Sequence, residues 1–521
     1  MNINTLIRKI YLPLPLPTET DSRSDCRRIL DTLAEQGFDS VQIPLAVRQQ
    51  LYPLLPQSGY RVTASLCFDG TFWQLTGLEA GDTTSALYGL ATDLGSTSVA
   101  MELVDLSSGQ VLASASSYQK QIAHGEDILN RIFYAKDQPE HLQELQQEAV
   151  DTLEELMDQL TAASGIDVRN CACMTLAGNT TMTHFLLGLD AFCVFSSPYA
   201  VHVDTPGFFF AKEIGLTLHG LLFCFPSRAN YLGGDIISGM IATELYKKES
   251  ISAFFDIGTN GELVIGNRDF LICGAGAAGP ALEGGSVTTG MRASDGAIDS
   301  IRLSGDDFSY TTIGEKPPIG ICGSGITDLM AELFLHGIVD IRGQFVENSS
   351  PHLIYKEKAA GSANKVPEGI TYAPGLVFYQ KDIHEFLRTK AAAYTMMAVL
   401  MEQTGITAED ISDYYMAGAF GAHINKHSAV SIGMYPDVTY DRIHTVGNTS
   451  LKGARMLLLD RALLDDLHTI LEKMEYVQLG SVGNFLEIME AASYLPHIDI
   501  ERFPSVKKEL EKKKYKYYNH C

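Results

Sequence analysis

Two short segments of the chain share one design, and this repeat restricts the possible folds more than any other feature. They are Thr92-Asp93-Leu94-Gly95-Ser96-Thr97-Ser98 and Phe255-Asp256-Ile257-Gly258-Thr259-Asn260-Gly261. Each has an Asp-x-Gly-Ser/Thr sequence between two apolar runs, which is typical of the turn of a β-hairpin. Because the two hairpins are far apart in the sequence, they predict a duplicated fold.

Both turns carry groups that suit a polyphosphate. Glycine lets backbone N–H groups approach an anion because no Cβ is in the way, and hydroxyl groups add further donors. The carboxylates of Asp93 and Asp256 can hold a hydrated Mg²⁺ ion, although plain turn-capping is the simpler alternative for both. We expect the two hairpins to clamp one polyphosphate from two sides. The phosphate-binding residues would be Gly95, Ser96, Thr97, Ser98, Gly258, Thr259, Asn260 and Gly261.

Length and composition restrict the number of structural units and the class of partner. A chain of 521 residues is too long for one core and predicts two to four units. The net charge of −24 argues against a nucleic-acid partner, because phosphate contacts need clustered Lys and Arg. No signal pattern and no apolar run of bilayer length occurs, so we expect a cytoplasmic protein without a membrane partner.

The nine cysteines include no C-x-x-C pair. The closest spacing is Cys171-Ala172-Cys173. This usage argues against a disulfide framework and against an iron–sulfur ligand set. We expect most of the cysteines to be small buried apolar residues.

The order of apolar patterns predicts an α/β protein. Residues 1–86 read as a small α/β domain with a helix over Ser24–Gln36 and a strand over Tyr60–Phe68. From Leu87 onward strands alternate with helices, which is the pattern of an α/β fold. We therefore expect one lobe over residues 87–250, a second over residues 251–440, and C-terminal helices over residues 441–521 that return to the first lobe and end in a basic tail.

Further glycine-rich stretches lie where a nucleotide clamp would use them. Gly233–Met240 and Val446–Ala454 read as small-residue helices that cross as a hinge or simply pack tightly. Gly320–Asp328 opens a helix, so Gly323 and Ser324 suit an anion or a ribose, while a close helix–strand turn explains them equally well. The turn of Gly418, Ala419, Phe420 and Gly421 can bring backbone against a flat base or ribose.

Taken together, these motifs resemble the actin-like ATPase superfamily, whose fold is a duplicated ribonuclease-H-like domain. Within it, the chain is similar to the ATP-dependent reductive activators of corrinoid proteins over most of residues 87–480, and its leading domain is similar as well. The segments that carry the resemblance are Ala91–Val104, Gly125–Arg131, Ala177–Met182, Ala278–Gly284, Gly320–Asp328 and Ala417–Gly421.

The resemblance implies ATP and Mg²⁺ as cofactors and a corrinoid protein of a methyltransferase system as the partner. Asp93 and Asp256 would position the metal and the attacking water, with Glu262 as a water-orienting base. Activators of this branch usually carry an iron–sulfur domain, and this sequence begins after the place where that domain would lie. We therefore expect no cluster and a separate reductase as electron donor, and a homodimer is one assembly that this interpretation allows.

Two other functions stay open at this point. One is a small-molecule kinase of the same superfamily, and the other is a non-catalytic protein whose conformation depends on bound nucleotide. The loop Cys273–Gly285 is the candidate contact for the corrinoid protein, although a glycine-rich core crossing explains it equally well.

Overall fold

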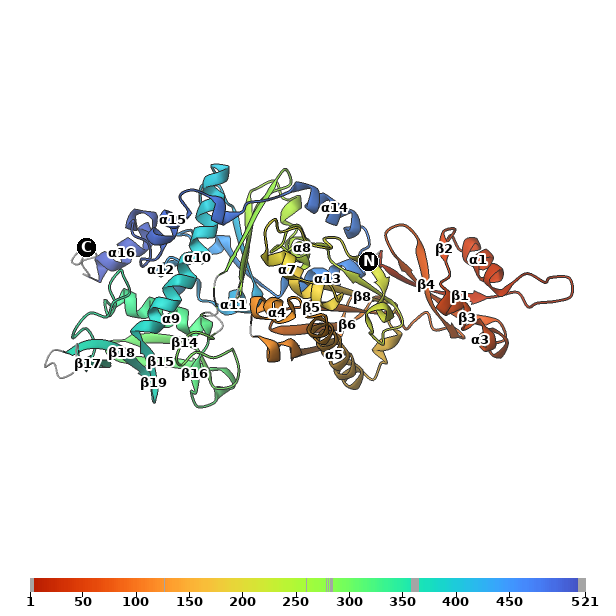
Figure 1. Cartoon of the computed structure of the whole chain (residues 1–521), viewed down its shortest axis with the longest axis horizontal. Helices are drawn as coiled ribbons and strands as arrows, with labels where there is room; N and C mark the ends of the chain where they lie inside the picture. The colour runs from red at the N-terminus through yellow and green to blue at the C-terminus, as the bar shows by residue number, and fades with distance from the viewer. Residues whose placement is uncertain are drawn as a thin grey trace. The chain divides into compact units, whose positions relative to one another are not determined.

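The structure is a computed structural model, which describes residues 4–125, 127–258, 260–277, 279, 281, 284–357 and 365–513 (Figure 1). The chain forms two compact units. Unit 1 combines the residues up to Glu244 with Thr449–Lys473, and unit 2 combines Leu245–Asn448 with the residues from Met474 onward. Thr259, Ala278, Glu126 and the last basic residues of the tail lie outside the described residues.

Unit 1 begins with a four-stranded sheet in the order β1-β3-β4-β2. Its strands are β1 (Ile7–Pro13), β2 (Val41–Gln42), β3 (Arg61–Phe68) and β4 (Trp73–Ala80), and its helices are α1 (Asp25–Glu35), α2 (Leu45–Arg48) and α3 (Leu51–Gln57). Ser24 caps α1 by accepting a hydrogen bond from the N–H of Arg27. The apolar faces of α1 and β3 close a core around Ile29, Leu33 and Val62.

The first lobe follows in unit 1 as a six-stranded sheet in the order β7-β6-β5-β8-β10-β9. The strands β5, β6 and β7 form the expected antiparallel meander, and β8 and β10 run parallel to β5. Their bounds are β5 (Tyr88–Leu94), β6 (Ser98–Asp105), β7 (Val111–Tyr118), β8 (Cys173–Gly178), β9 (Gly207–Phe210) and β10 (Leu221–Cys224).

Helices cover both faces of this sheet. Leucines of the long helix α5, drawn in brown in Figure 1, share a core with Leu90 and Met101 of the strands. The other face packs against α13, where Thr175 Oγ1 of β8 donates a 2.8 Å hydrogen bond to the carbonyl of Ala454. The helices of this lobe are α4 (Ile128–Ala135), α5 (Pro139–Ser164), α6 (Thr180–Leu186), α7 (Phe192–Phe195), α8 (Gly234–Thr243), α13 (Thr449–Leu459) and α14 (Leu463–Lys473).

Unit 2 repeats this plan. Its main sheet has the order β21-β20-β11-β12-β13-β22, in which β13-β12-β11-β20-β21 reproduces the strand order and directions of β7-β6-β5-β8-β10. The bounds are β11 (Ser252–Ile257), β12 (Asn260–Gly266), β13 (Leu271–Ala277), β20 (Asp413–Ala417), β21 (Ile443–Gly447) and β22 (Met474–Tyr476). The predicted duplicated, ribonuclease-H-like fold is therefore confirmed.

Two small sheets are inserted in unit 2. One contains β14 (Ala297–Ser304), β15 (Asp307–Thr312) and β16 (Gly320–Ile321), and the other contains β17 (Leu353–Glu357), β18 (Lys365–Ala373) and β19 (Leu376–Tyr379). The core joins strand residues such as Phe255 and Leu263 to residues of α10 such as Phe386. The helices are α9 (Gly323–Leu335), α10 (Gln380–Thr404), α11 (Gly418–His423), α12 (Lys426–Ser431), α15 (Phe485–Ala492) and α16 (Pro504–Lys512).

The C-terminal part differs from the prediction that residues 441–521 return to the first lobe. Ile443–Gly447 forms β21 and completes the second sheet, and only Thr449–Lys473 joins unit 1. The predicted loop Cys273–Gly285 is wrong in its first half, because Cys273–Ala277 belongs to β13 and pairs with β12. Within the described ranges, none of the helices combines the length and the apolar character that crossing a bilayer requires.

Candidate functional site

The Asp93 hairpin lies where β5 ends and β6 begins. Asp93 is half-buried and is paired with Ala100 of β6 and Ala177 of β8. A Cβ on Gly95 would collide with the carbonyl oxygen of Ser98, so the tight turn requires glycine there. The turn contains Ser96 and Thr97, and β6 begins at Ser98.

The N-terminal turn of α13 contacts the Asp93 carboxylate. Ser450 Oγ donates a 2.8 Å hydrogen bond to Asp93 Oδ1, although the two residues are 357 positions apart. A carboxylate is stabilised at this end of a helix by the helix dipole. Ser238 of α8 in turn donates to the carbonyl of Ser450 at 2.6 Å, and a Cβ on Gly453 would collide with the carbonyl of Ser238. The two small-residue helices thus cross closely, and both belong to unit 1.

The Asp256 hairpin in unit 2 has the same backbone plan with different neighbours. Asp256, at the end of β11, is paired with Glu262 of β12 and Ala417 of β20. Directly opposed residues of antiparallel strands project to the same face, so the two carboxylates lie on one face of the sheet. The N–H of Gly258 donates to the carbonyl of Asn260 at 2.8 Å, which closes the turn, and Gly261 is paired with Ile257.

The backbone of Gly418 packs closely against the Asp256 side chain. Its φ of +81° lies in the left-handed region, and a Cβ there would be 2.7 Å from Asp256 Oδ1 and 3.3 Å from the carbonyl oxygen of Ile257. Gly421 packs similarly against the backbone of Met416. The side chains of Ala419 and Phe420 lie outside the described set, so their contact with a base or ribose stays a prediction.

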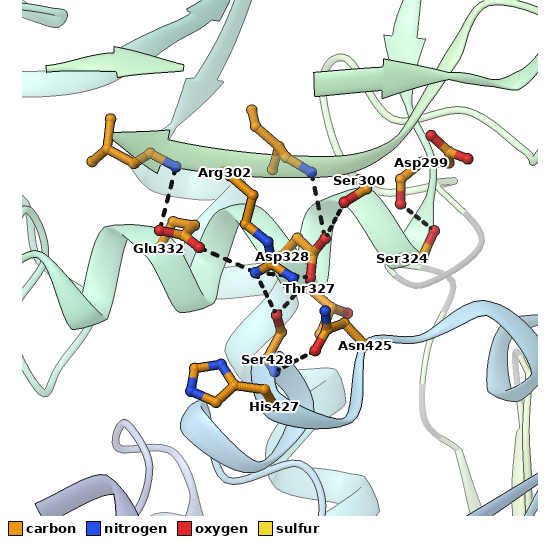
Figure 2. Close-up of polar contacts among 12 residues, drawn as sticks. Asp299, Ser300, Arg302, Ser324, Thr327, Asp328, Glu332, Asn425, His427 and Ser428 are labelled. Atoms are coloured by element: carbon orange, nitrogen blue, oxygen red, sulfur yellow. Dashed lines mark hydrogen bonds and ion pairs between the residues drawn. The ribbon is translucent and has the colours of Figure 1, made fainter. Parts of the chain in front are cut away.

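The Gly320–Asp328 turn is occupied by contacts within unit 2 (Figure 2). Ser324 Oγ donates to the carbonyl of Asp299 at 2.8 Å, and a Cβ on Gly325 would collide with the carbonyl of Ile298. Behind it, buried Asp328 accepts hydrogen bonds from Ser300 Oγ at 2.8 Å and Ser428 Oγ at 2.5 Å. The turn brings α9 close to β14, and a ribose-binding role for Gly323 and Ser324 stays a prediction.

Two residues near the hairpins were not among the predicted site residues. Ser450 could not be assigned from sequence because its partner is so distant along the chain. Gly178 follows Ala177 as Gly418 follows Ala417, and a Cβ on Gly178 would be 2.8 Å from the carbonyl oxygen of Leu94. The repeated Ala-Gly pair at the ends of β8 and β20 was the signal that could have found it.

Comparison with known proteins connects these features to one family. Three family models match consecutive segments: the RACo linker region over residues 1–85, the RACo middle region over 88–248, and the C-terminal domain of RACo, the ASKHA domain, over 250–507. The chain is 30% identical over 431 residues to the corrinoid activation enzyme RamQ of Eubacterium limosum, which covers 79% of this chain and 70% of that protein. The chain belongs to the RACo family.

Two further matches agree with this membership. A solved structure described as a reductive activator for corrinoid,iron-sulfur protein has a TM-score of 0.86 and 33% identity, covering 97% of this chain and 81% of that chain. A [Co(II) methylated amine-specific corrinoid protein] reductase of Methanosarcina barkeri is 26% identical over 272 residues, covering 48% of this chain and 46% of that protein. The resemblance indicated by the motifs is confirmed. In RACo terms, the Asp93 hairpin lies in the middle region and the Asp256 hairpin in the ASKHA domain.

Proposed function

We propose that this RACo-family chain is an ATP-dependent activator that reduces the cobalt of a corrinoid protein in a methyltransferase system. The observation that carries the proposal is its similarity to a solved reductive activator along 97% of its length. The relatives named as a corrinoid activation enzyme and a corrinoid protein reductase support the same partner class. The chemical step is addition of one electron to Co(II), giving Co(I).

This reduction requires an energy source because Co(I) is hard to reach at available potentials. A one-electron gap of about 300 mV costs about 7 kcal/mol. ATP binding and hydrolysis supply a conformational change that alters the grip on the corrinoid protein and the coordination of the cobalt. The electron comes from a separate reductase, because the cysteine spacing of this sequence offers no cluster ligand set.

The Asp93 hairpin would bind phosphate through the main chain and hydroxyls of Gly95–Ser98. The tight turn at Gly95 would present backbone N–H groups to an anion, and the 2.8 Å hydrogen bond from Ser450 would hold the Asp93 carboxylate in one orientation. The carboxylate would act on a hydrated Mg²⁺ ion. Catalysis of this kind depends on positioning and charge stabilisation.

The Asp256 hairpin would carry the larger share of the chemistry. Asp256 would hold Mg²⁺, and Glu262, on the same face of the sheet, would orient the attacking water. Gly418, the first residue of α11 after β20, lies so close to the Asp256 carboxylate that a side chain there would collide with it. Gly258–Gly261 would complete the phosphate contacts of this hairpin.

The proposal is tested by an anaerobic assay with purified corrinoid protein, a one-electron reductase and ATP. We expect ATP hydrolysis to be stimulated by the corrinoid protein, and Co(I) to accumulate, as its absorbance shows, only when ATP is present. Bound ATP without stimulation by any corrinoid protein, or Co(I) formation that is independent of ATP, would contradict it.

A further inference from the structure

A cluster of potential metal ligands lies in unit 1, apart from both hairpins. His124 ends the 3₁₀ turn Lys120–His124, and Glu144 and Glu148 are one helical turn apart on α5. Residues spaced by four positions share one face of a helix, so both carboxylates project toward the histidine. His124 Nε2 is 3.0 Å from Glu148 Oε1 and 3.8 Å from Glu144 Oε1, and one ligand atom of each residue lies within 4.8 Å of the other two.

We propose that His124, Glu144 and Glu148 bind a divalent transition-metal ion, with solvent completing its coordination. Two ligands that are each about 2.1 Å from a tetrahedral zinc ion lie about 3.4 Å apart. The separations of 3.0 and 3.8 Å from His124 Nε2 lie on either side of that value, so small side-chain rotations would bring all three atoms to one ion. One imidazole and two carboxylates suit zinc or manganese, whereas they lack the thiolates that softer ions prefer.

One buried carboxylate oxygen of Glu148 supports a cation over a simple ion pair. Glu148 Oε2 is buried and has no hydrogen-bond partner among the residues that the structure describes. Leaving a charged acceptor unsatisfied is costly, and a single Nε2–H can donate well to only one of the two carboxylates. A bound ion would contact all three side chains and compensate both carboxylates. Glu144 is about half exposed, which leaves a path for the ion to enter.

The residues around the cluster fix the orientation of the ligands. Tyr134 donates its hydroxyl to Glu144 Oε2 at 2.7 Å, and its ring stacks on His124 with 4.4 Å between ring centres. His141 stacks on the other side of Tyr134 at 4.1 Å. Such supporting contacts typically hold metal ligands in place, and their loss weakens metal affinity.

The ion would have a structural role, because it would stabilise a segment of the chain that belongs to neither hairpin. His124 directly precedes Gly125, whose carbonyl accepts a 2.8 Å hydrogen bond from Arg131 Nε of α4. A metal at His124 would anchor this turn to α5 and so stabilise the start of the Gly125–Arg131 segment. Glu126 of that segment lies outside the described residues.

Zinc binding to the full chain tests the proposal. After treatment with a chelator, the wild type and the variants H124A, E144Q and E148Q are titrated with Zn²⁺ by calorimetry, and native mass spectrometry counts the bound ions. We expect the wild type to bind an ion that H124A loses, with affinity at least 10-fold weaker in E144Q and E148Q. E140Q is the matched control, because Glu140 is exposed in the first turn of α5, and it should bind like the wild type.

Two results would overturn the proposal. Equal zinc stoichiometry and affinity in all variants would mean that any bound ion sits elsewhere, for example on the thiols. If neither Zn²⁺ nor Mn²⁺, used as a second probe, binds to the wild type, the three side chains contact one another without an ion and the proposal is wrong. Circular dichroism checks the fold of each variant, and the half-exposed E144Q keeps the test decisive if H124A unfolds.

Discussion

The two hairpins share a backbone plan, but their aspartates have different neighbours. Asp93 faces Ala100 across the strand pair and accepts a hydrogen bond from Ser450 at the start of a helix. Asp256 faces a second carboxylate, Glu262, and packs against a glycine, Gly418. The duplication has therefore kept the strand order while the side chains diverged.

We expect this difference to give the two hairpins unequal roles. A pair of carboxylates on one face can divide metal binding and water activation between them, which a carboxylate opposite alanine cannot do. A carboxylate held at a helix N-terminus is instead fixed in orientation. We expect changes around Asp256 to reduce ATP turnover more than changes around Asp93, and the following variants test that ranking.

Removal of the Asp256 charge should have the largest effect. We expect D256N to lower the rate of ATP hydrolysis by about 10²–10³-fold, because the metal and the water lose their main anionic contact. Phosphate release measures the rate, and thermal melting checks the fold. The ranking fails if D93N, prepared in parallel, loses more activity than D256N.

Substitution of Gly418 should cause the next largest loss of ATP turnover. G418A forces a side chain into a left-handed conformation, which costs about 1–2 kcal/mol, and places its Cβ against the Asp256 carboxylate. We expect ATP turnover to fall about 10²-fold along with a lower melting temperature. G375A is the matched control, because Gly375 has a φ of +75° with nothing within 4 Å of its Cβ position. It should lower the melting temperature only, and equal losses of activity in both variants would contradict a local effect on Asp256.

Glu262 should affect catalysis more than binding. We expect E262Q to lower the rate constant of ATP hydrolysis at least 10-fold while ATP still binds, because the amide cannot accept a proton from water. Calorimetric titration with ATP and phosphate release separate the two quantities. A variant with unchanged turnover would show that the carboxylate opposite Asp256 is not used.

The smallest effect should come from removal of the hydrogen bond that Ser450 donates to Asp93. S450A removes one hydrogen bond to a carboxylate, which is typically worth about 1.5–3 kcal/mol, mainly in the stability of unit 1. We expect a lower melting temperature and a loss of ATP turnover of less than about 10-fold. S164A, which removes a hydroxyl that donates to the backbone carbonyl of Leu160 on α5, is the control. A loss of turnover with S450A as large as that with D256N would reverse the ranking of the halves.

Local patterns predicted much of the fold. The hairpins at Asp93 and Asp256 and the capped helix α1 follow from alternation, glycine turns and capping residues over short spans. Pairings between distant residues were not accessible, which is why the contact of Ser450 with Asp93 was missed. The predicted return to the first lobe holds for Thr449–Lys473, but the predicted bounds, 441–521, were too wide. Strand β21 was missed because the short run Ile443–Gly447 includes His444 and Thr445 and lacks a clear apolar pattern.

The Gly320–Asp328 turn shows a different limit of prediction from sequence. Small residues at a helix start suit a ligand and also suit close packing on a strand, and the sequence alone does not separate the two. In the structure, Ser324 donates a hydrogen bond to the β14 backbone and Gly325 packs against it.

The dependence of cobalt reduction on ATP and on Asp256 can be measured in one experiment. Under anaerobic conditions, the absorbance of Co(I) is followed after ATP is added to corrinoid protein and reductase, with either the wild type or D256N. We expect ATP-dependent formation of Co(I) with the wild type and a rate at least about 10²-fold slower with D256N. Equal rates with the two proteins, or an equal rate without ATP, would contradict it.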